Sequence, residues 1–202
     1  MYVKNIHQKP NPHLMVQHLH QHYPGARYVA AYEAGKFGFW IQRQLNTYGI
    51  ECLIVNPADI PKSQKDTLQK TDPRDARNLG LRLQSGVLKG IHVPDEQQEA
   101  DRIFFRHRKR IWKDLTRCKN RIKGVLAFSG IDIPEQYDNA SWSHNFINWL
   151  QQLDCKQTSR RTALNYMITQ MEFLRKELLS ISNAIRKMMR EQRYNTNYYL
   201  LR

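Results

Sequence analysis

Two carboxylates in the stretch LQKTDPRDARNLG, residues 68–80, have the type and spacing to do chemistry. Asp72 and Asp75 stand three residues apart, so on a helix they would share one face, and hard divalent cations prefer carboxylate oxygens. The alternative is an ordinary helix start, with Thr71 or Asp72 capping the first turn. Pro73 would then sit near the first helical position, and Asp75 would complement the helix dipole. Short motifs often match by chance, so this stretch alone favours the helix start and its neighbours must decide.

A third carboxylate, Glu33, follows an apolar, strand-like stretch, ARYVAAYEAG, residues 26–35. A charged group at the end of a buried strand is costly without a partner. Together with Asp72 and Asp75 it could hold two divalent ions, one activating the attacking oxygen of a phosphoryl transfer and one stabilising the leaving oxygen. The alternative, in which Glu33 is simply exposed at a strand end, leaves the coincidence of three carboxylates unexplained.

Apolar strands alternate with helices in the first half of the chain. This order indicates an α/β layer with parallel pairing, whose ligand sites gather at the carboxyl ends of the strands. Glu33 and Asn56 would lie there. The expected strands are residues 1–9, 26–35 and 50–57; the expected helices are residues 11–25, residues 36–49 and a helix from near Asp72, after a polar loop over residues 58–71.

Two long helices are expected in the second half, over residues 95–128 and 159–192, with a short amphipathic helix within residues 141–153 between them. Apolar residues recur on both long helices at heptad-like spacing, which predicts an antiparallel pair or a dimerising coiled coil. The chain therefore divides into residues 1–93, an α/β domain, and residues 94–202, an all-α coiled-coil region. The expected seams are Phe104, Ile111, Leu115, Cys118, Ile122 and Val125 on the first helix, and Leu164, Met167, Met171, Leu174, Leu178, Ile181, Ile185 and Met188 on the second.

The charge of the chain indicates a polyanionic partner. Lys and Arg number 32 against 18 Asp and Glu, for a formal net charge of +14, which favours nucleic acid first and an anionic membrane surface second. Cations crowd the first long helix with Asp114 as the only acid between them, and phosphates would relieve their repulsion. The alternative is a solvated helix face. The candidate nucleic-acid-binding residues are Lys70, Arg74, Arg102, Arg106, Arg108, Lys109, Arg110, Lys113, Arg117, Lys119, Arg121 and Lys123.

Membrane and disulfide-rich classes are not expected. No stretch has the length and apolarity of a membrane span, and the first residues lack the apolar core of a signal peptide. Cys52, Cys118 and Cys155 are far apart and odd in number, which indicates reduced structural thiols in a cytoplasmic protein.

Two other patterns have ordinary interpretations. His18 and His22 share a helix face with no cysteine or carboxylate beside them, so a zinc site is not expected. Trp142 and Trp149 recur at helical spacing and are expected in the core rather than as platforms for bases.

Two longer stretches resemble the N-terminal half of the DEDD-motif insertion-sequence transposases, a family that includes the Piv invertase. They are YEAGKFGFWIQRQLNTYGIECLIVNPADIPK and KTDPRDARNLGLRLQSGVLKGIHVPD, and the similarity extends from near Met1 to about Gly130. The motifs E-A-G after a strand and K-T-D-x-x-D-A occur in the same order. The resemblance implies an RNase H-like, RuvC-type domain whose Asp-Glu-Asp-Asp set binds Mg²⁺ or Mn²⁺. It also implies a coiled-coil segment for homo-oligomerisation, a separate domain with a nucleophilic serine and, in some members, a structured guide RNA.

By this resemblance Glu33, Asp72 and Asp75 match the second, third and fourth acidic positions. The first has no counterpart, because no aspartate precedes Asp59 and residues 1–9 resemble the third strand of that fold. The expectation is thus an RNase H-like domain incomplete at its N-terminus, followed by a helical coiled-coil region, in a truncated DNA transposase that is inactive alone. Two alternatives stay open: a catalytically dead nucleic-acid-binding remnant that modulates the complete enzyme, and a resolvase-like nuclease selective for branched DNA.

Overall fold

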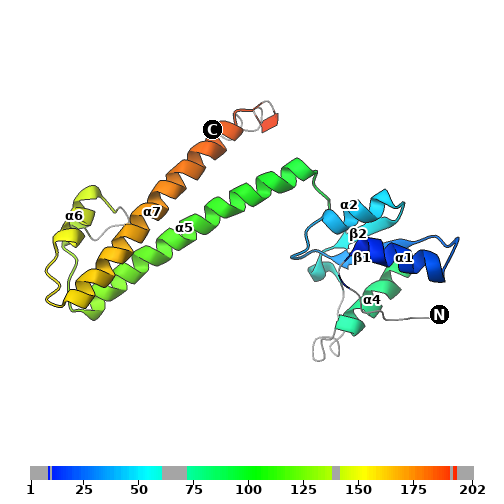
Figure 1. The fold of residues 1–202 in the computed structure, drawn as a ribbon, viewed down its shortest axis with the longest axis horizontal. Helices are drawn as coiled ribbons and strands as arrows, with labels where there is room; N and C mark the ends of the chain where they lie inside the picture. Colours follow the sequence, from blue (N-terminus) through cyan, green and yellow to red (C-terminus); the bar gives the residue numbers. More distant parts are fainter. Residues whose placement is uncertain (1–8, 10, 61–71, 138–141, 192, 195–202) are drawn as a thin grey trace. The chain divides into compact units, whose positions relative to one another are not determined.

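Two compact units make up the protein, Met1–Pro94 and Asp95–Arg202 (Figure 1). The computed structural model describes residues 9, 11–60, 72–137, 142–191 and 193–194. The division falls within one residue of the boundary expected from the sequence.

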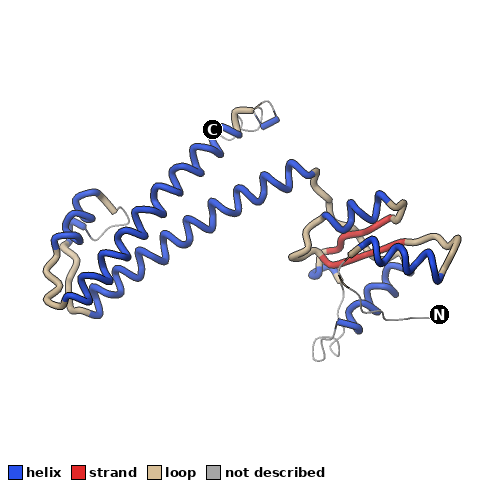
Figure 2. Tube along the Cα trace, in the orientation of Figure 1, coloured by secondary structure: helices blue, strands red, loops and turns tan. Residues whose placement is uncertain are grey.

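The first unit has a small parallel sheet between helices (Figure 2). The two strands pair in parallel, with Val29 opposite Glu51 and Glu33 opposite Val55. A core of Val16, Leu45, Ile50 and Cys52 joins the first two helices to one face of the sheet, and α4 contacts β1. The elements are α1 (Pro12–His22), β1 (Val29–Glu33), α2 (Trp40–Thr47), β2 (Glu51–Val55), a 3-10 turn η1 (Pro57–Asp59) and α4 (Asp72–Gln84).

Local sequence explains where these helices begin and end. The Asn11 side chain accepts a hydrogen bond from the His13 amide at 3.0 Å, and Pro12 follows it as the first helical residue of α1. The helix α2 begins at Trp40, four residues later than expected, because the chain first makes a turn in which Gly38 has a φ of +60°. The expectation of a helix from residue 36 was therefore wrong at its start.

The RNase H-like assignment stays a prediction. In the described part of the chain the sheet has two strands, β1 and β2, which is compatible with a partial α/β domain. The strand expected over residues 1–9 and most of the loop expected over residues 58–71 lie outside the described residues.

The second unit is a long antiparallel helical pair with a short helix near one end (Figure 1). Of the two arrangements left open by the sequence, the seams form the antiparallel pair within one chain. Leu126 is buried at the end of the first seam where Val125 was expected, and the second long helix ends at Met188 rather than near residue 192. The elements are α5 (Glu96–Phe128), a 3-10 turn η2 (Glu135–Tyr137), α6 (His144–Gln152) and α7 (Thr158–Met188).

The main core lies where α6 packs against the loop ends of α5 and α7. Phe146 is fully buried there, with its ring centroid 4.9 Å from that of Trp142 and 5.7 Å from that of Trp149. Both tryptophans belong to this core, as expected. Cys118 is also fully buried in it, and all three cysteines are buried and free, as expected for structural thiols.

A polar cluster of Asp95, Asp101, Arg193 and Tyr194, here called the terminal cluster, joins the other ends of α5 and α7. Arg193 donates to both carboxylate oxygens of Asp95 at 2.9 Å, while the Asp95 side chain also caps α5 by accepting from the Gln98 amide at 2.8 Å. Tyr194 donates its hydroxyl hydrogen to Asp101, which is 7% exposed. These contacts hold together residues almost a hundred positions apart.

The terminal cluster predicts a loss of stability in acid. The helix-cap bond from Gln98, and then the bond from Arg193, lower the pKa of Asp95 below its ordinary value of 3.8. A depressed folded-state pKa stabilises the fold above the unfolded value, and this contribution is lost as the pH falls through the folded pKa. The free energy of unfolding should therefore decrease as the pH falls from about 5 to below 3.8, and decrease less in Asp95→Asn, which keeps a capping side chain.

Urea unfolding across that pH range measures the effect. The exposed Asp132 provides the control, because Asp132→Asn removes a carboxylate of the same unit for which no partner is seen in the described residues. Equal pH dependence in the protein and in Asp95→Asn would contradict the assignment.

Candidate functional site

Glu33 is the last residue of β1 and is exposed at the carboxyl edge of the sheet. The chain then turns away: the Ala34 amide donates to the Val55 carbonyl at 2.8 Å, and the Tyr32 hydroxyl donates to the Gly38 carbonyl at 2.8 Å. The apolar strand thus ends at the carboxylate, and the turn after it is anchored back on the strand. This is the position in the sheet that the sequence predicted for Glu33.

Asp72 begins α4, and Asp75 lies half-buried in its first turn. A separation of three residues places the two on one face of the helix. Because α4 contacts β1, the helix start and the strand that ends at Glu33 belong to adjoining elements. The described part of α4 begins at Asp72, and a helix start is also a place where a carboxylate pair can serve as ligands.

The chemistry of these donors fits Mg²⁺ or Mn²⁺, which favour carboxylate oxygens. Within the described residues, however, no three His, Cys, Asp or Glu side chains are grouped so as to hold a metal ion. Glu33 and Asp75 supply two described carboxylates, whereas the side chain of Asp72 lies outside the described part of the structure, as does Lys70. The ion therefore stays a prediction.

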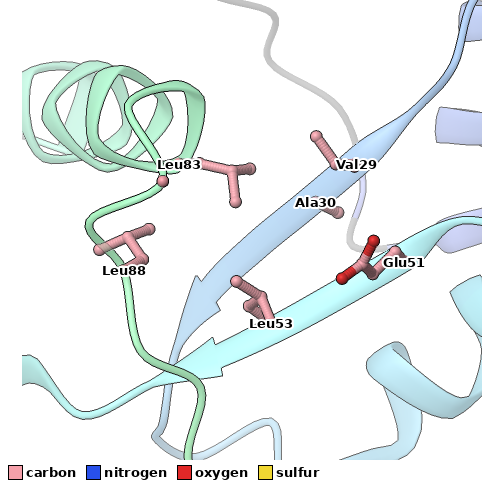
Figure 3. A pocket seen from close by; sticks show the side chains of 7 residues that line it. Val29, Ala30, Glu51, Leu53, Leu83 and Leu88 are labelled. Atoms are coloured by element: carbon pink, nitrogen blue, oxygen red, sulfur yellow. The ribbon is translucent and has the colours of Figure 1, made fainter.

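A hollow of about 220 Å³ opens beside the sheet, between its strands and the end of α4 (Figure 3). The side chains that line it include Leu53, Leu83 and Leu88. Its one titratable side chain, Glu51, pairs with Arg27 at 3.4 Å. The hollow therefore brings together no set of acid–base or metal-binding groups.

Five of the predicted nucleic-acid-binding residues form a straight row on α5, here called the α5 stripe. They are separated by four, three, four and four positions, so they recur on one line of the helix, and all five are exposed. At 100° per residue this line lies opposite the buried seam through Ile111, Leu115, Cys118 and Ile122. The α5 stripe consists of Arg102, Arg106, Lys109, Lys113 and Arg117.

Other predicted cations of α5 are engaged within the fold. Arg108 donates to the Ser182 hydroxyl at 2.9 Å, which ties α5 to α7. Lys119 is half-buried with its ammonium 5.5 Å from the Trp142 ring centroid, and burial, then the charge of Arg175, lowers its pKa. Within the stripe, Arg117 lies 2.7 Å from Asp114, an exposed pair of little energetic weight. Arg74 is exposed in the first turn of α4, and Arg110 and Arg121 are exposed on α5.

Two exposed aromatic residues of α5 were not predicted. Phe105 is 41% exposed and Trp112 is 52% exposed. By contrast Phe104, an aromatic residue of the seam on the same helix, packs against the core. Their signal was present in the sequence, since neither position belongs to the heptad-like seam.

The chain belongs to the IS110 family of transposases, because the family model DEDD_Tnp_IS110, described as a transposase, matches residues 7–130. The match includes Glu33, Asp72 and Asp75 and reaches the end of α5.

Three curated proteins illustrate the relationship. A sequence-predicted transposase of Sinorhizobium fredii, y4qE, is 31% identical over 68% of this chain and 34% of its own length. Another from the same bacterium, y4rJ, is 37% identical over 51% of this chain and 28% of its own. The transposase for insertion sequence element IS1533 of Leptospira borgpetersenii is 27% identical over 85% of this chain and 49% of its own.

The chain thus spans between about a quarter and a half of the length of the relatives that it matches. No solved structure matches it. Among the described residues, no helix combines the length and apolarity needed to cross a membrane.

Proposed function

We propose that this chain is part of an insertion-sequence transposase that acts on DNA by metal-dependent phosphodiester chemistry. One observation carries the proposal: within the family match, Glu33 ends β1 and Asp72 and Asp75 open α4, which contacts that strand. A carboxylate at a strand end and two at an adjoining helix start could converge on a divalent cation.

In this proposal Glu33, Asp72 and Asp75 hold Mg²⁺ or Mn²⁺, which when bound would polarise the reacting phosphate and its attacking and leaving oxygens. The carboxylates bind the ion and fix its position against the sheet. The α5 stripe holds the phosphate backbone of the nucleic acid through charge-assisted contacts, together with Arg74 and Lys70, which stand beside the carboxylates in the sequence.

Manganese binding tests the metal site directly, by electron paramagnetic resonance of the free ion as protein is added. We expect Glu33→Gln, Asp72→Asn and Asp75→Asn each to weaken binding at least about tenfold, because each removes a charged ligand. Asp59→Asn, in η1 of the same unit, is the matched control and should bind like the unaltered protein. Glu51→Gln, at the amino end of β2 and so at the opposite edge of the sheet, is a second control and should also bind like the unaltered protein. Equal affinity in the unaltered protein, the three ligand variants and the controls would contradict the site.

A second candidate is a nucleic-acid-binding remnant without catalysis, which would modulate the complete enzyme. The observation that favours it is the exposed row of cations of the α5 stripe, which could bind nucleic acid whether or not a metal ion is held. Alanine at Asp72 and Asp75 would leave the binding of such a remnant unchanged. Cleavage of four-way DNA junctions by this chain would instead indicate a resolvase-like nuclease.

A guide RNA and a homo-oligomer stay predictions. The seams of α5 and α7 cover each other within one chain, so they are not themselves a reason to expect a second copy. Light scattering of the protein with and without nucleic acid would establish its oligomeric state.

A further inference from the structure

Phe105 and Trp112 lie on the flank of α5 between the α5 stripe and the buried seam, with cations of the stripe on one side of them. Side chains three and four positions apart are neighbours on a helix. Phe105 therefore lies next to Arg102 and Lys109, and Trp112 next to Arg108 and Lys109. The two rings are seven residues apart, so they face the same side of α5 about 10 Å from each other.

These rings keep large apolar faces in water. Phe105 is 41% and Trp112 52% exposed, while the core of the same unit buries comparable rings almost completely, Phe146 at 0% and Trp142 at 4%. Other rings of this unit, such as Tyr166 and Phe173, are exposed as well, so it is the combination of rings and cations on one helix that points to a binding site. The occupant must suit both flat apolar rings and a row of cations.

Charge selects among possible occupants. A second copy of the chain docked symmetrically through this face would bring the same row of arginines and lysines against it, and like charges repel. A nucleic acid supplies phosphates for the cations and flat bases for the rings. In a nucleic-acid duplex the base faces are stacked on one another, so the aromatic rings of α5 cannot reach them. Unpaired bases are free to stack on these rings.

We propose that α5 binds single-stranded nucleic acid, with phosphates along the α5 stripe and unpaired bases stacked on Phe105 and Trp112. This deepens the proposed function and rests on its nucleic-acid contact at α5. RNA and DNA share the chemistry used here, because both offer phosphates and π faces. The site would hold a strand opened during recombination or an unpaired segment of an RNA.

Fluorescence anisotropy with labelled strands of about 12 nucleotides tests the proposal. The probes are oligo(dT), oligo(rU) and a DNA duplex of equal length. The variants are Trp112→Ala, Trp112→Leu, Trp112→Phe and the double variant Phe105→Ala/Trp112→Ala. Tyr166→Ala is the matched control, because Tyr166 is a 75% exposed aromatic of α7 with no charged residue three or four positions away.

We expect Trp112→Ala and Trp112→Leu to weaken single-strand binding about fivefold or more, and the double variant further. Duplex binding should change less than twofold. Trp112→Phe should retain most of the affinity, since an aromatic face remains, and Tyr166→Ala should bind like the unaltered protein. The relative affinity of oligo(dT) and oligo(rU) then tells which nucleic acid the surface prefers.

Four results would overturn the inference. The first two are an equal loss of affinity for duplex and single strands in the alanine variants, and equal single-strand affinities of Trp112→Ala and Trp112→Phe. The third is loss of a dimer in Trp112→Ala with single-strand binding unchanged, and the fourth is no single-strand binding by the unaltered protein. If the protein binds duplex and the Trp112 variants keep its affinity, the proposed nucleic-acid contact is retained and the stacking surface is rejected. If neither is bound, both fail. Far-UV circular dichroism confirms that each variant is folded. If the alanine variant unfolds, the comparison of Trp112→Leu with Trp112→Phe still tests whether an aromatic face is needed.

Discussion

Phe146→Ala is expected to destabilise the helical unit by about 3–5 kcal/mol, the cost typical of removing a buried aromatic ring. Phe146 is fully buried, and its ring centroid lies 4.9 Å from that of Trp142 and 5.5 Å from that of Tyr137. Alanine would leave a cavity where α6 meets α5 and α7, and the surrounding rings belong to separate segments that cannot all close over it. For a domain of this size such a loss is a large part of the total stability.

Urea unfolding followed by circular dichroism measures this loss. Phe173→Ala is the control, because Phe173 lies on α7 in the same unit but is 60% exposed, so its removal should cost about 0.5 kcal/mol or less. If the two variants were destabilised equally, Phe146 would not be the centre of the core.

Neutralising part of the α5 stripe is expected to weaken nucleic-acid binding by about two to three orders of magnitude at 0.1 M salt. In Arg106→Gln/Lys109→Gln/Lys113→Gln, three phosphate contacts are removed. Each contact contributes about 0.9 to the slope of log affinity against log salt with duplex DNA and about 0.7 with a single strand, so the slope falls by about 2.7 or about 2.1. Since counterion release vanishes near 1 M salt, the two proteins should bind about equally there and diverge as salt is lowered.

A control with the same net charge separates local contact from general attraction. Lys176→Gln/Lys187→Gln/Arg190→Gln removes three exposed cations of α7 and its C-terminal end instead. We expect it to retain most of the affinity and of the salt slope. Identical slopes in the two triple variants would show that binding depends on total charge and not on the α5 stripe.

Periodicity in the sequence was enough to predict most elements of this fold. The strands around Val29–Glu33 and Glu51–Val55, the helix from Asp72 and the two long helices are where apolar spacing and turn residues indicated. The errors have local causes. A turn through Gly38 places the start of α2 later than expected. The last turn of the α5 seam buries Leu126 rather than Val125, because an α-helix has 3.6 residues per turn whereas the heptad pattern assumes 3.5.

The candidate site was less accessible from the sequence. A row of ten cations on one helix does not reveal which of them face outward, and the pairing of α5 with α7 decides that Arg108 and Lys119 contact the fold itself. Bonds such as Arg193 to Asp95 join residues 98 positions apart, and no periodic pattern encodes such a distance. The exposure of Trp112 could have been predicted from its place outside the seam.

The contact between Asp95 and Arg193 makes the pair of α5 and α7 an arm that is closed at one end, its base, by residues that flank the two helices. The helix α5 has 33 residues, so the arm reaches about 50 Å from that base to the region of α6. The length of the arm can therefore change without altering the contact between Asp95 and Arg193 at its base. Removing one matched seven-residue segment from each long helix would bring the tip about 10 Å nearer and leave both ends in place. Evolution or design can therefore adjust the length of the pair of α5 and α7 in steps of about two helical turns.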